Sequence, residues 1–437
     1  MAVTPTASPH PWRWIPSLYF AEGLPYVIVM TVSVVMYKNL RVSNTAIALY
    51  TSWLYLPWVI KPFWSPFVDL FRTKRWWIVS LQFVLGGALA AVALTVPGPL
   101  FFRGSLAFFW LLAFSSATHD IAADGFFLLA LPSHDQAAFV GVRSTFYRLA
   151  TLAGQGGLVW LAGTLSAATG AVAQAWAGVF ALAAAVFLLA GLYHLVFLPR
   201  PAGDHAVARG PRLVAGWFEA FAALFRKQDL AVILGFLLLY RFAEAQLLKL
   251  VTPFLLDARS DGGLGLPTQQ VGILYGTIGV IALTLGGLAG GYAIARGGLK
   301  RLLWPMILAM YAPNVVFILL ALFQPAGLFV IGGALAVEQF GYGFGFTAYL
   351  LYMMLVADGE HKTAHYAICT GFMALGIMLP GMAAGWIQEK LGYVNFFIWV
   401  CVATIPSFAA TALIKVDPAF GKKAPPDGAI PSGRSPA

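Results

Sequence analysis

Long apolar segments constrain this chain more than any other feature of its sequence. Three of them, residues 78–96, 173–198 and 327–356, each reach roughly the 20 residues that an α-helix needs to cross a lipid bilayer. Backbone polar groups in lipid must be hydrogen-bonded within the protein, which leaves helices or a closed β-barrel. Because the apolar runs are continuous and do not alternate with polar residues, we predict membrane-spanning α-helices.

The scarcity of charge supports this prediction. Charged residues make up 10% of the 437 residues, whereas a soluble domain has roughly 25%, and the mean hydropathy is +0.80. So few charges cannot cover a water-facing surface. No polar stretch is long enough for a soluble catalytic domain, and the two cysteines, Cys369 and Cys401, lie in apolar runs. We therefore expect no enzyme activity, no cofactor and no metal site.

The apolar runs predict an all-α membrane protein with about twelve transmembrane helices. The first six are expected near residues 17–37, 45–63, 76–96, 104–131, 137–165 and 173–197. The last six are expected near residues 229–256, 268–295, 300–322, 326–357, 363–386 and 393–414.

Basic residues are distributed unevenly between the predicted loops. With twelve spans, most of the 27 Lys and Arg lie on the side of the membrane that holds the N-terminus. Cytoplasmic loops carry an excess of Lys and Arg, so both termini are predicted to be cytoplasmic. The net charge of +10 therefore indicates orientation and not binding to nucleic acid. We expect a multi-pass protein of the bacterial inner membrane, and residues 1–16 lack the pattern of a cleaved signal peptide.

The chain divides into two halves at a polar stretch rich in Pro, Gly and Arg. Phe20-Ala21-Glu22 in the first span is repeated as Phe242-Ala243-Glu244 in the seventh. Two six-helix halves related by an axis along the membrane normal are the major facilitator architecture, with the substrate site between the halves. The expected domains are an N-terminal bundle (1–198), a cytoplasmic linker (199–228), a C-terminal bundle (229–415) and a disordered cytoplasmic tail (416–437).

The loop after the second span supports this architecture. Ser65-Pro66-Phe67-Val68-Asp69 is followed by Arg72 and Arg75, and this resembles the Gly-x-x-x-Asp-plus-basic loop of the superfamily, with Ser65 in place of Gly. Asp69, Arg72 and Arg75 are candidates for a cytoplasmic gate that joins the two halves. The alternative is that Asp69 merely offsets the positive charge of the loop.

Ten charged residues lie well inside the predicted spans, where each costs roughly 2.5–3.5 kcal/mol. They are the acids Glu22, Asp120, Asp124, Glu244 and Glu338 and the bases Lys61, Arg143, Arg148, Arg241 and Lys249. All five acids fall on spans one, four, seven and ten, which line the central cavity of the major facilitator fold. We therefore predict that these acids serve transport.

The spacing of these charges suggests how they work. Asp120 and Asp124 are four residues apart on one helix face, and two carboxylates that close cannot both ionise cheaply in a low dielectric. One of them is therefore our first choice for the group that carries a proton, ahead of Glu22 and Glu338, with Glu244 as a further candidate. The alternative is a set of static ion pairs that fix the packing of the helices.

Several other residues are candidates for binding substrate or for pairing with the acids. We expect Arg241 to pair with Glu244, Arg148 to face the fourth span, and Lys61 to reach the membrane interface; Lys249 has no assigned role. His119 is either a proton relay beside Asp120 or a packing residue. The substrate-binding or charge-pairing candidates are Arg143, Arg148, Arg241, Tyr147, Tyr240, Gln339 and His119, with Tyr19 and Tyr26 as further rings that could stack on sugars.

At these same positions the chain resembles the AmpG-type permeases, a major facilitator branch related to the eukaryotic acetyl-coenzyme A transporters. The matching stretches are Phe20 to Pro25, Lys61 to Pro66 with Asp69, Ser116 to Asp124, Tyr147-Arg148-Leu149, Tyr240-Arg241 with Glu244, and Glu338-Gln339. The resemblance implies proton-driven import of a small molecule. In the best-known members the cargo is an anhydro-muropeptide, a fragment recovered from the periplasm for cell-wall recycling.

Two departures from those members leave the cargo open. They carry two further C-terminal spans, and they have a small polar residue where this chain has Glu22. The alternative cargoes are a siderophore or another oligosaccharide, and the non-transport alternative is a membrane sensor. We expect a monomer whose partners are its small-molecule substrate, protons and the lipid bilayer.

Overall fold

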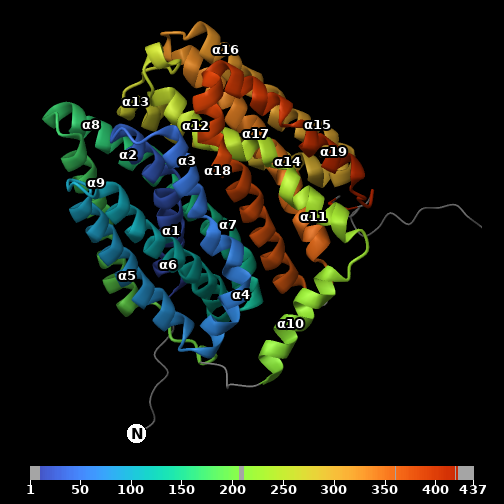
Figure 1. Ribbon diagram of the computed structural model, residues 1–437. Coiled ribbons are helices and arrows are strands. Elements are labelled where there is room, and N and C mark those ends of the chain that lie inside the picture. The colour runs from blue at the N-terminus through green and yellow to red at the C-terminus, as the bar shows by residue number, and fades with distance from the viewer. Residues whose placement is uncertain (1–9, 206–210, 360, 419, 422–437) are drawn as a thin grey trace, which may run out of the picture.

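A computed structural model describes residues 10–205, 211–359, 361–418 and 420–421, and over these residues the chain folds into helices without a β-strand (Figure 1). The first half begins with the short turn η1 (Pro11–Arg13). Its helices are α1 (Ile15–Val27), η2 (Ile28–Val32), α2 (Ser33–Asn39), α3 (Asn44–Trp53), α4 (Leu56–Leu70), α5 (Lys74–Thr95), α6 (Phe101–Ala130), α7 (Ser133–Thr151), η3 (Leu152–Leu158), α8 (Val159–Thr169) and α9 (Val172–Phe197).

The second half follows the linker helix α10 (Pro211–Phe225). Its helices are α11 (Leu230–Leu239), α12 (Phe242–Leu256), η4 (Arg259–Asp261), α13 (Thr268–Val271), η5 (Gly272–Gly279), α14 (Val280–Gly297), α15 (Leu299–Tyr311), η6 (Ala312–Asn314), α16 (Val315–Phe323), α17 (Leu328–Ala357), α18 (Lys362–Val402) and α19 (Ile405–Leu413).

Nine helical stretches among the described residues are long and apolar enough to cross a membrane. The longest, Lys362–Leu413, has 52 residues and reverses at Gly392, whose φ of 72° suits glycine. It therefore provides two spans. Two further helical runs, Asn44–Leu70 and Ser133–Thr169, are also long enough for a bilayer, although the first is interrupted near Leu54 and the second is more polar. Together these give twelve spans, as the sequence predicts.

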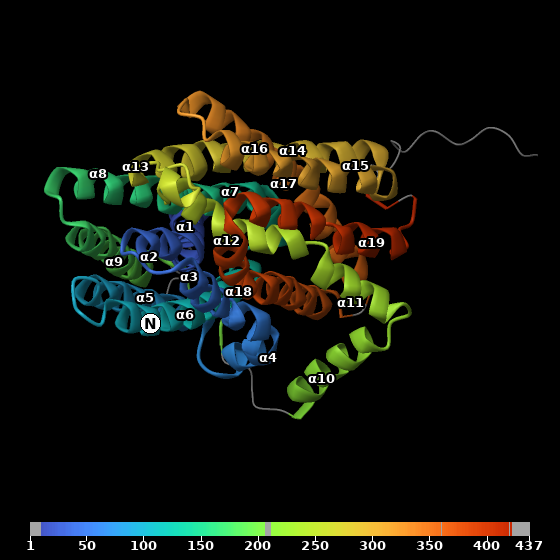
Figure 2. The same ribbon diagram turned by 45° about the horizontal axis from the view of Figure 1, so that its top comes forward.

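The helices form two bundles that lie side by side. In Figure 2 the blue to green helices α1–α9 lie on one side and the yellow to red helices on the other, and α10 lies apart from both. The second half has one hydrophobic core, built around Phe236 and Tyr349. The first half has two, one built around Trp176 and Phe180 and a smaller one around Trp14 and Phe126. Few core residues are shared between the halves, which agrees with the two halves seen in the sequence. The exact domain limits stay a prediction.

The bundles meet along several helices, and one contact is very close. α3 and α4 pack on α18, α2 packs on α12, α8 packs on α13, and η3 packs on η5. At the last of these a Cβ atom on Gly276 would lie 2.1 Å from the carbonyl oxygen of Gln155. Only glycine fits there, so the sequence of η5 sets how closely the halves approach.

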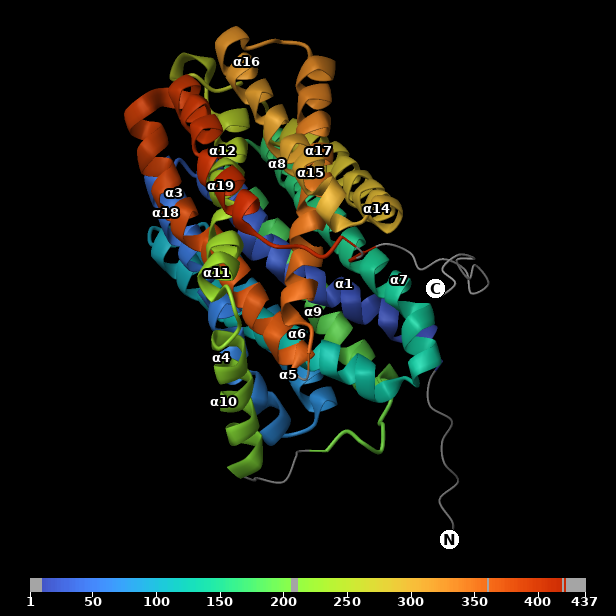
Figure 3. The ribbon, with the colours of Figure 1, turned by 90° about the vertical axis from the view of Figure 1, so that its right-hand side faces the viewer.

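Two ends of the bundle can be told apart. The α10 end carries α10 and the α4–α5 turn, and the opposite end carries the α2–α3 turn and α16 (Figure 3). We call them the α10 end and the α2–α3 end.

Candidate functional site

Five charged side chains from four helices of the first bundle come together. One carboxylate oxygen from each of Glu22 on α1 and Asp120 and Asp124 on α6 lies within 4.8 Å of the other two. Lys61 on α4 forms an ion pair with Asp120. An Arg143 guanidinium nitrogen on α7 lies 2.6 Å from Asp124 Oδ1. We call these five residues the acid cluster.

The acid cluster contains three carboxyl groups and only two bases. Both bases are paired with aspartates, and within the described part of the chain Glu22 has no ion-pair partner. The Glu22 side chain is 5% exposed and its Oε2 atom has no hydrogen-bond partner. A buried carboxylate without a partner is costly, so the cluster favours one bound proton or cation.

The acid cluster is partly exposed on one side and buried on the other. The Asp124 side chain is 42% exposed, whereas Glu22 is almost completely buried. The Arg143 guanidinium also lies 4.7 Å from the ring centre of Tyr19, which holds it in place by a cation–π contact. The cluster is therefore accessible at Asp124 and buried at Glu22.

The packing of α1 against α7 brings Glu22 to this position. A Cβ atom on Gly23 would lie 3.1 Å from both Ala150 Cβ and the carbonyl oxygen of Tyr147. The glycine that follows Glu22 therefore permits the close approach of the two helices. Tyr147 lies at this contact, beside the acid cluster.

A second site lies between the bundles. It is a cavity of about 260 Å³, and two of its lining residues are the cations Arg241 and Lys249 on the second bundle. Among the described residues that line it there is no Asp or Glu. Its other polar or aromatic lining residues are Tyr26, Thr31, Tyr55, Gln155, Thr252, Tyr275, Gln339, Tyr342 and Phe346. We call it the central cavity.

Arg241 does not pair with Glu244, so that prediction is wrong. Arg241 donates a hydrogen bond to the Tyr342 hydroxyl, and its guanidinium lies 4.7 Å from the ring centre of Phe346. Both carboxylate oxygens of Glu244 are buried without a hydrogen-bond partner. The reason is a break in the helix: Arg241 has φ −107° and ψ 17°, so the three-residue spacing does not bring the two side chains together.

Two further polar side chains, Glu338 and Asn314, are buried in the second bundle, and the sequence singles out only the first. Glu338 is fully buried, accepts a hydrogen bond of 2.9 Å from Gln339, and leaves its Oε1 atom without a partner. Asn314 in η6 is 1% exposed, and neither polar atom of its side chain has a partner. A lone asparagine in an apolar span gave no signal that could have identified it.

Three other predicted residues have different partners from those expected. Arg148 donates to Thr284 Oγ1 of α14 at 3.1 Å, so it contacts the other bundle and not the fourth span. Lys61 does not extend to the membrane interface, because it pairs with Asp120. Tyr240 is fully buried and donates to the Gly345 carbonyl at 2.9 Å, so it belongs to the core.

His119 turns away from Asp120. It lies 3.1 Å from the Gln82 amide nitrogen, and Gln82 Oε1 lies 2.8 Å from His194 Nδ1. The Ser17 hydroxyl lies 2.9 Å from His194 Nε2, which completes a buried chain across four helices. The relay with Asp120 is not formed, and the chain fixes the packing of α1, α5, α6 and α9.

The residues of the expected gate at the α10 end contact their own bundle and the linker. Arg75 donates through Nε to the Leu198 carbonyl at 3.3 Å, and its backbone amide donates to Asp204 at 3.0 Å. The Arg72 guanidinium lies 5.8 Å from the Trp76 ring centre. The Asp69 side chain lies outside the described part of the structure.

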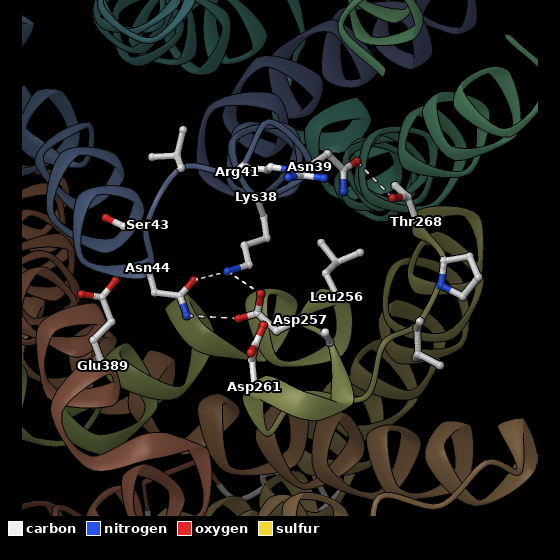
Figure 4. A pocket seen from close by; sticks show the side chains of 14 residues that line it. Lys38, Asn39, Arg41, Ser43, Asn44, Leu256, Asp257, Asp261, Thr268 and Glu389 are labelled. Atoms are coloured by element: carbon white, nitrogen blue, oxygen red, sulfur yellow. Dashed lines mark hydrogen bonds and ion pairs between the residues drawn. The ribbon is translucent and has the colours of Figure 1, made fainter. Parts of the chain in front are cut away.

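Polar side chains join the two bundles at the α2–α3 end, beside a surface pocket of about 700 Å³ (Figure 4). Lys38 Nζ lies 2.5 Å from Asp257 Oδ1 and 2.8 Å from Asn44 Oδ1. The Tyr393 hydroxyl donates to Asp257 at 2.6 Å, and Asn44 donates to Gln388 at 2.7 Å. These residues lie near helix ends, where charged and polar side chains are common. Only charges inside the spans stand out in the sequence, which therefore does not identify them.

Comparisons with known proteins agree with this architecture. The family model described as "Major Facilitator Superfamily" matches residues 17–379. The chain is 26% identical over 401 residues to the "Anhydromuropeptide permease" of Escherichia coli (strain K12), covering 89% of this chain and 76% of the relative. It is 24% identical over 405 residues to a Rickettsia felis protein whose name includes "transporter AmpG 4", covering 89% and 93%.

Solved structures show the same fold. The nucleoside transporter NupG has a TM-score of 0.68 at 16% identity and covers 92% of this chain and 99% of its own. The D-xylose-proton symporter has a TM-score of 0.66 at 15% identity and covers 94% and 98%. The predicted fold class is confirmed, and the family and fold are those of transporters. The chain belongs to the major facilitator superfamily, as an AmpG-like permease.

Proposed function

We propose that this transporter imports an anhydro-muropeptide, a periplasmic cell-wall fragment, across the bacterial inner membrane, and that protons drive the import. The observation that carries the proton coupling is the unpaired carboxyl group of Glu22 beside two ion-paired aspartates. The sequence favoured Asp120 or Asp124 as the proton carrier. Because each of these has a basic partner, the contacts favour Glu22 instead.

The acid cluster can couple a proton to a change in packing. With Glu22 protonated, the remaining two carboxylates balance Lys61 and Arg143. When Glu22 loses its proton, it competes with Asp124 for Arg143, because the three carboxylates lie within 4.8 Å. The competition changes contacts among α1, α6 and α7, and such a change favours one orientation of the bundles over another.

A proton fits this position better than a metal ion. Three carboxylates within 4.8 Å of one another could hold a cation. However, Lys61 and Arg143 already supply two positive charges there, and a further cation would be repelled by both. A proton satisfies the single unpaired carboxyl group without this cost.

The distribution of Lys and Arg supports an orientation in which the α10 end is cytoplasmic. The network of Lys38, Asn44 and Asp257 then closes the periplasmic side, and the exposed side of Asp124 is reached from the cytoplasm. In this conformation a proton leaves Glu22 toward the cytoplasm. Both termini and α10 lie on the cytoplasmic side in this proposal.

The central cavity supports an anionic sugar-containing cargo. Its tyrosines can stack on sugar rings, and Arg241 and Lys249 can bind carboxylates. A volume of about 260 Å³ is below the roughly 300–1,000 Å³ of ligand pockets, so the bundles must separate to admit the cargo. The relative named "Anhydromuropeptide permease" supports this choice of cargo over a siderophore.

The test is uptake of a labelled anhydro-disaccharide tripeptide into proteoliposomes that contain the purified full-length protein. We expect accumulation with an inward proton gradient, none with an inward sodium gradient alone, and none in liposomes without protein. Glu22→Gln should keep exchange and lose accumulation. Uptake driven equally by sodium, or a folded protein that does not take up the peptide, would contradict the proposal.

A further inference from the structure

The central cavity is lined by two basic side chains, and no described carboxylate lies within ion-pair distance of either. These side chains, Arg241 and Lys249, are each 4% exposed. A buried charge is tolerated when it is paired, so an anion that enters the cavity would stabilise the charged form of both side chains. Arg241 was already a candidate for binding cargo, whereas the sequence gave Lys249 no role.

The contacts of Lys249 show what is missing. Its ammonium nitrogen lies 3.0 Å from Thr51 Oγ1 and 5.2 Å from the ring centre of Tyr55. The Thr51 hydroxyl donates its own proton to the Ile47 carbonyl at 2.7 Å, so toward Lys249 it acts only as an acceptor. One neutral acceptor and one ring do not replace the hydration of an ammonium group that can donate three hydrogen bonds.

The position of Lys249 also links the two bundles. Lys249 lies on α12 of the second bundle, whereas Thr51 and Tyr55 lie on or beside α3 of the first. An anion bound by Lys249 in the cavity would therefore lie beside Tyr55 of the first bundle, which lines the same cavity. A residue that only fixed the packing of α12 on α3 would not need a charge, because methionine or leucine fills the same space.

We infer that Lys249 is a second anion-binding position of the central cavity and that the cargo carries two anionic groups. Arg241 binds one of them and Lys249 binds the other. Arg241 stands at the start of α12 and Lys249 lies about two turns further along it, so the two cations approach the cavity from different levels of the helix. The cavity thus favours a cargo that presents two separate anionic groups. This inference rests on the proposed transport function and adds a rule for its specificity.

The test is binding to the full-length protein in lipid nanodiscs, measured by calorimetry. The probes are an anhydro-muramoyl tripeptide with free carboxylates and the same peptide amidated at its C-terminal carboxylate. We expect the wild-type protein to bind the free acid 10- to 100-fold more tightly than the amide. In Lys249→Met the two probes should bind equally, and Lys249→Arg should restore the preference.

A second measurement separates binding from folding. Because Lys249→Met removes an unbalanced buried charge, the ligand-free variant should have a higher thermal midpoint than the wild-type protein. Lys362→Met, at an exposed position paired with Asp358, is the matched control and should change neither binding nor the midpoint.

The outcomes are distinct. If Lys249→Met still prefers the free acid as strongly as the wild-type protein does, the inference is wrong. It is also wrong if the wild-type protein binds neither probe or binds both equally. A charge preference that depends on Lys249, in a protein whose uptake ignores the proton gradient, would support this inference and reject only the proposed coupling.

Discussion

A guanidinium nitrogen of Arg143 lies 2.6 Å from Asp124 Oδ1, and the same guanidinium packs against the ring of Tyr19. Glu22 lies beside this pair and has no basic partner in the part of the chain that the structure describes. The ring contact restricts the guanidinium to a small region between α1 and α6. Arg143 can therefore reach either carboxylate with a small movement. A guanidinium shared between two acids is a simple means of converting the loss of one proton into a movement of helices.

Glu22→Gln removes the one carboxyl group of the acid cluster that has no basic partner within it. The two aspartates that remain balance the charges of the two bases. The amide keeps the shape of the side chain and cannot ionise, so the competition for Arg143 disappears. We expect proton-driven accumulation to be lost and exchange of cargo across the membrane to persist with little dependence on pH. The measurement is counterflow of labelled cargo at several pH values, compared between Glu22→Gln and the wild-type protein. Accumulation at the wild-type level in Glu22→Gln would exclude Glu22 as the proton carrier.

Asp120→Asn leaves Lys61 without its carboxylate. An unpaired charge in a partly buried site should lower the free energy of unfolding by about 1–3 kcal/mol. We therefore expect this variant to lose both accumulation and thermal stability. The double variant Lys61→Met/Asp120→Asn should recover the stability without recovering accumulation. If the effects of Lys61→Met and of Asp120→Asn on the free energy of unfolding simply add in the double variant, the double-mutant cycle shows that the two residues do not interact.

The positions of the helices could be predicted because they follow from the lengths of the apolar runs in the sequence. The membrane requires long apolar runs, and twelve such runs could be located from residue types alone. Even the repeat of Phe20-Ala21-Glu22 at Phe242-Ala243-Glu244 led to the right architecture. The division at Gly392 was also anticipated as a loop between two spans, because a reversal is needed there to keep the twelfth span within the bilayer.

Side-chain partners were harder to predict, because they depend on local backbone geometry and on exact helix lengths. Lys61 was expected near a helix end, but α4 continues to Leu70, which places Lys61 inside the bundle beside Asp120. Arg148 follows Arg143 by five residues, which is about 140° around a helix, so the two face different neighbours. The identity of the charged cluster was readable from the sequence, whereas its pairings were not.

The network at the α2–α3 end should control opening toward the outside. Lys38→Met removes the ion pair with Asp257, which is worth about 1 kcal/mol, so the open population should rise roughly five-fold. The readout is labelling of a cysteine introduced at Thr252, which lines the central cavity, by a membrane-impermeant maleimide in cells. The background has Cys369 and Cys401 replaced by serine.

Faster labelling from the outside in Lys38→Met would support both the gate and the orientation of the chain. Arg41→Met, on the same pocket, is the control, since no ion pair of Arg41 is seen among the described residues. A rate unchanged by Lys38→Met would show that the network does not hold the bundles together.

The contact between η3 and η5 should tolerate no side chain at residue 276. A Cβ atom there would lie 2.1 Å from the Gln155 carbonyl oxygen, so Gly276→Ala must push the bundles apart or distort both helices. Overpacking of this kind costs roughly 1–3 kcal/mol, and we expect a lower thermal midpoint together with slower transport. Gly291→Ala on α14 is the matched control, because nothing lies within 4 Å of its added Cβ and alanine favours a helix. It should match or slightly exceed the wild-type midpoint.

Since the close approach lies on the surface where the halves meet, Gly276→Ala should slow exchange as well as accumulation, whereas Glu22→Gln affects accumulation alone. Wild-type transport and stability in Gly276→Ala would mean that the bundles do not pack this closely in the membrane.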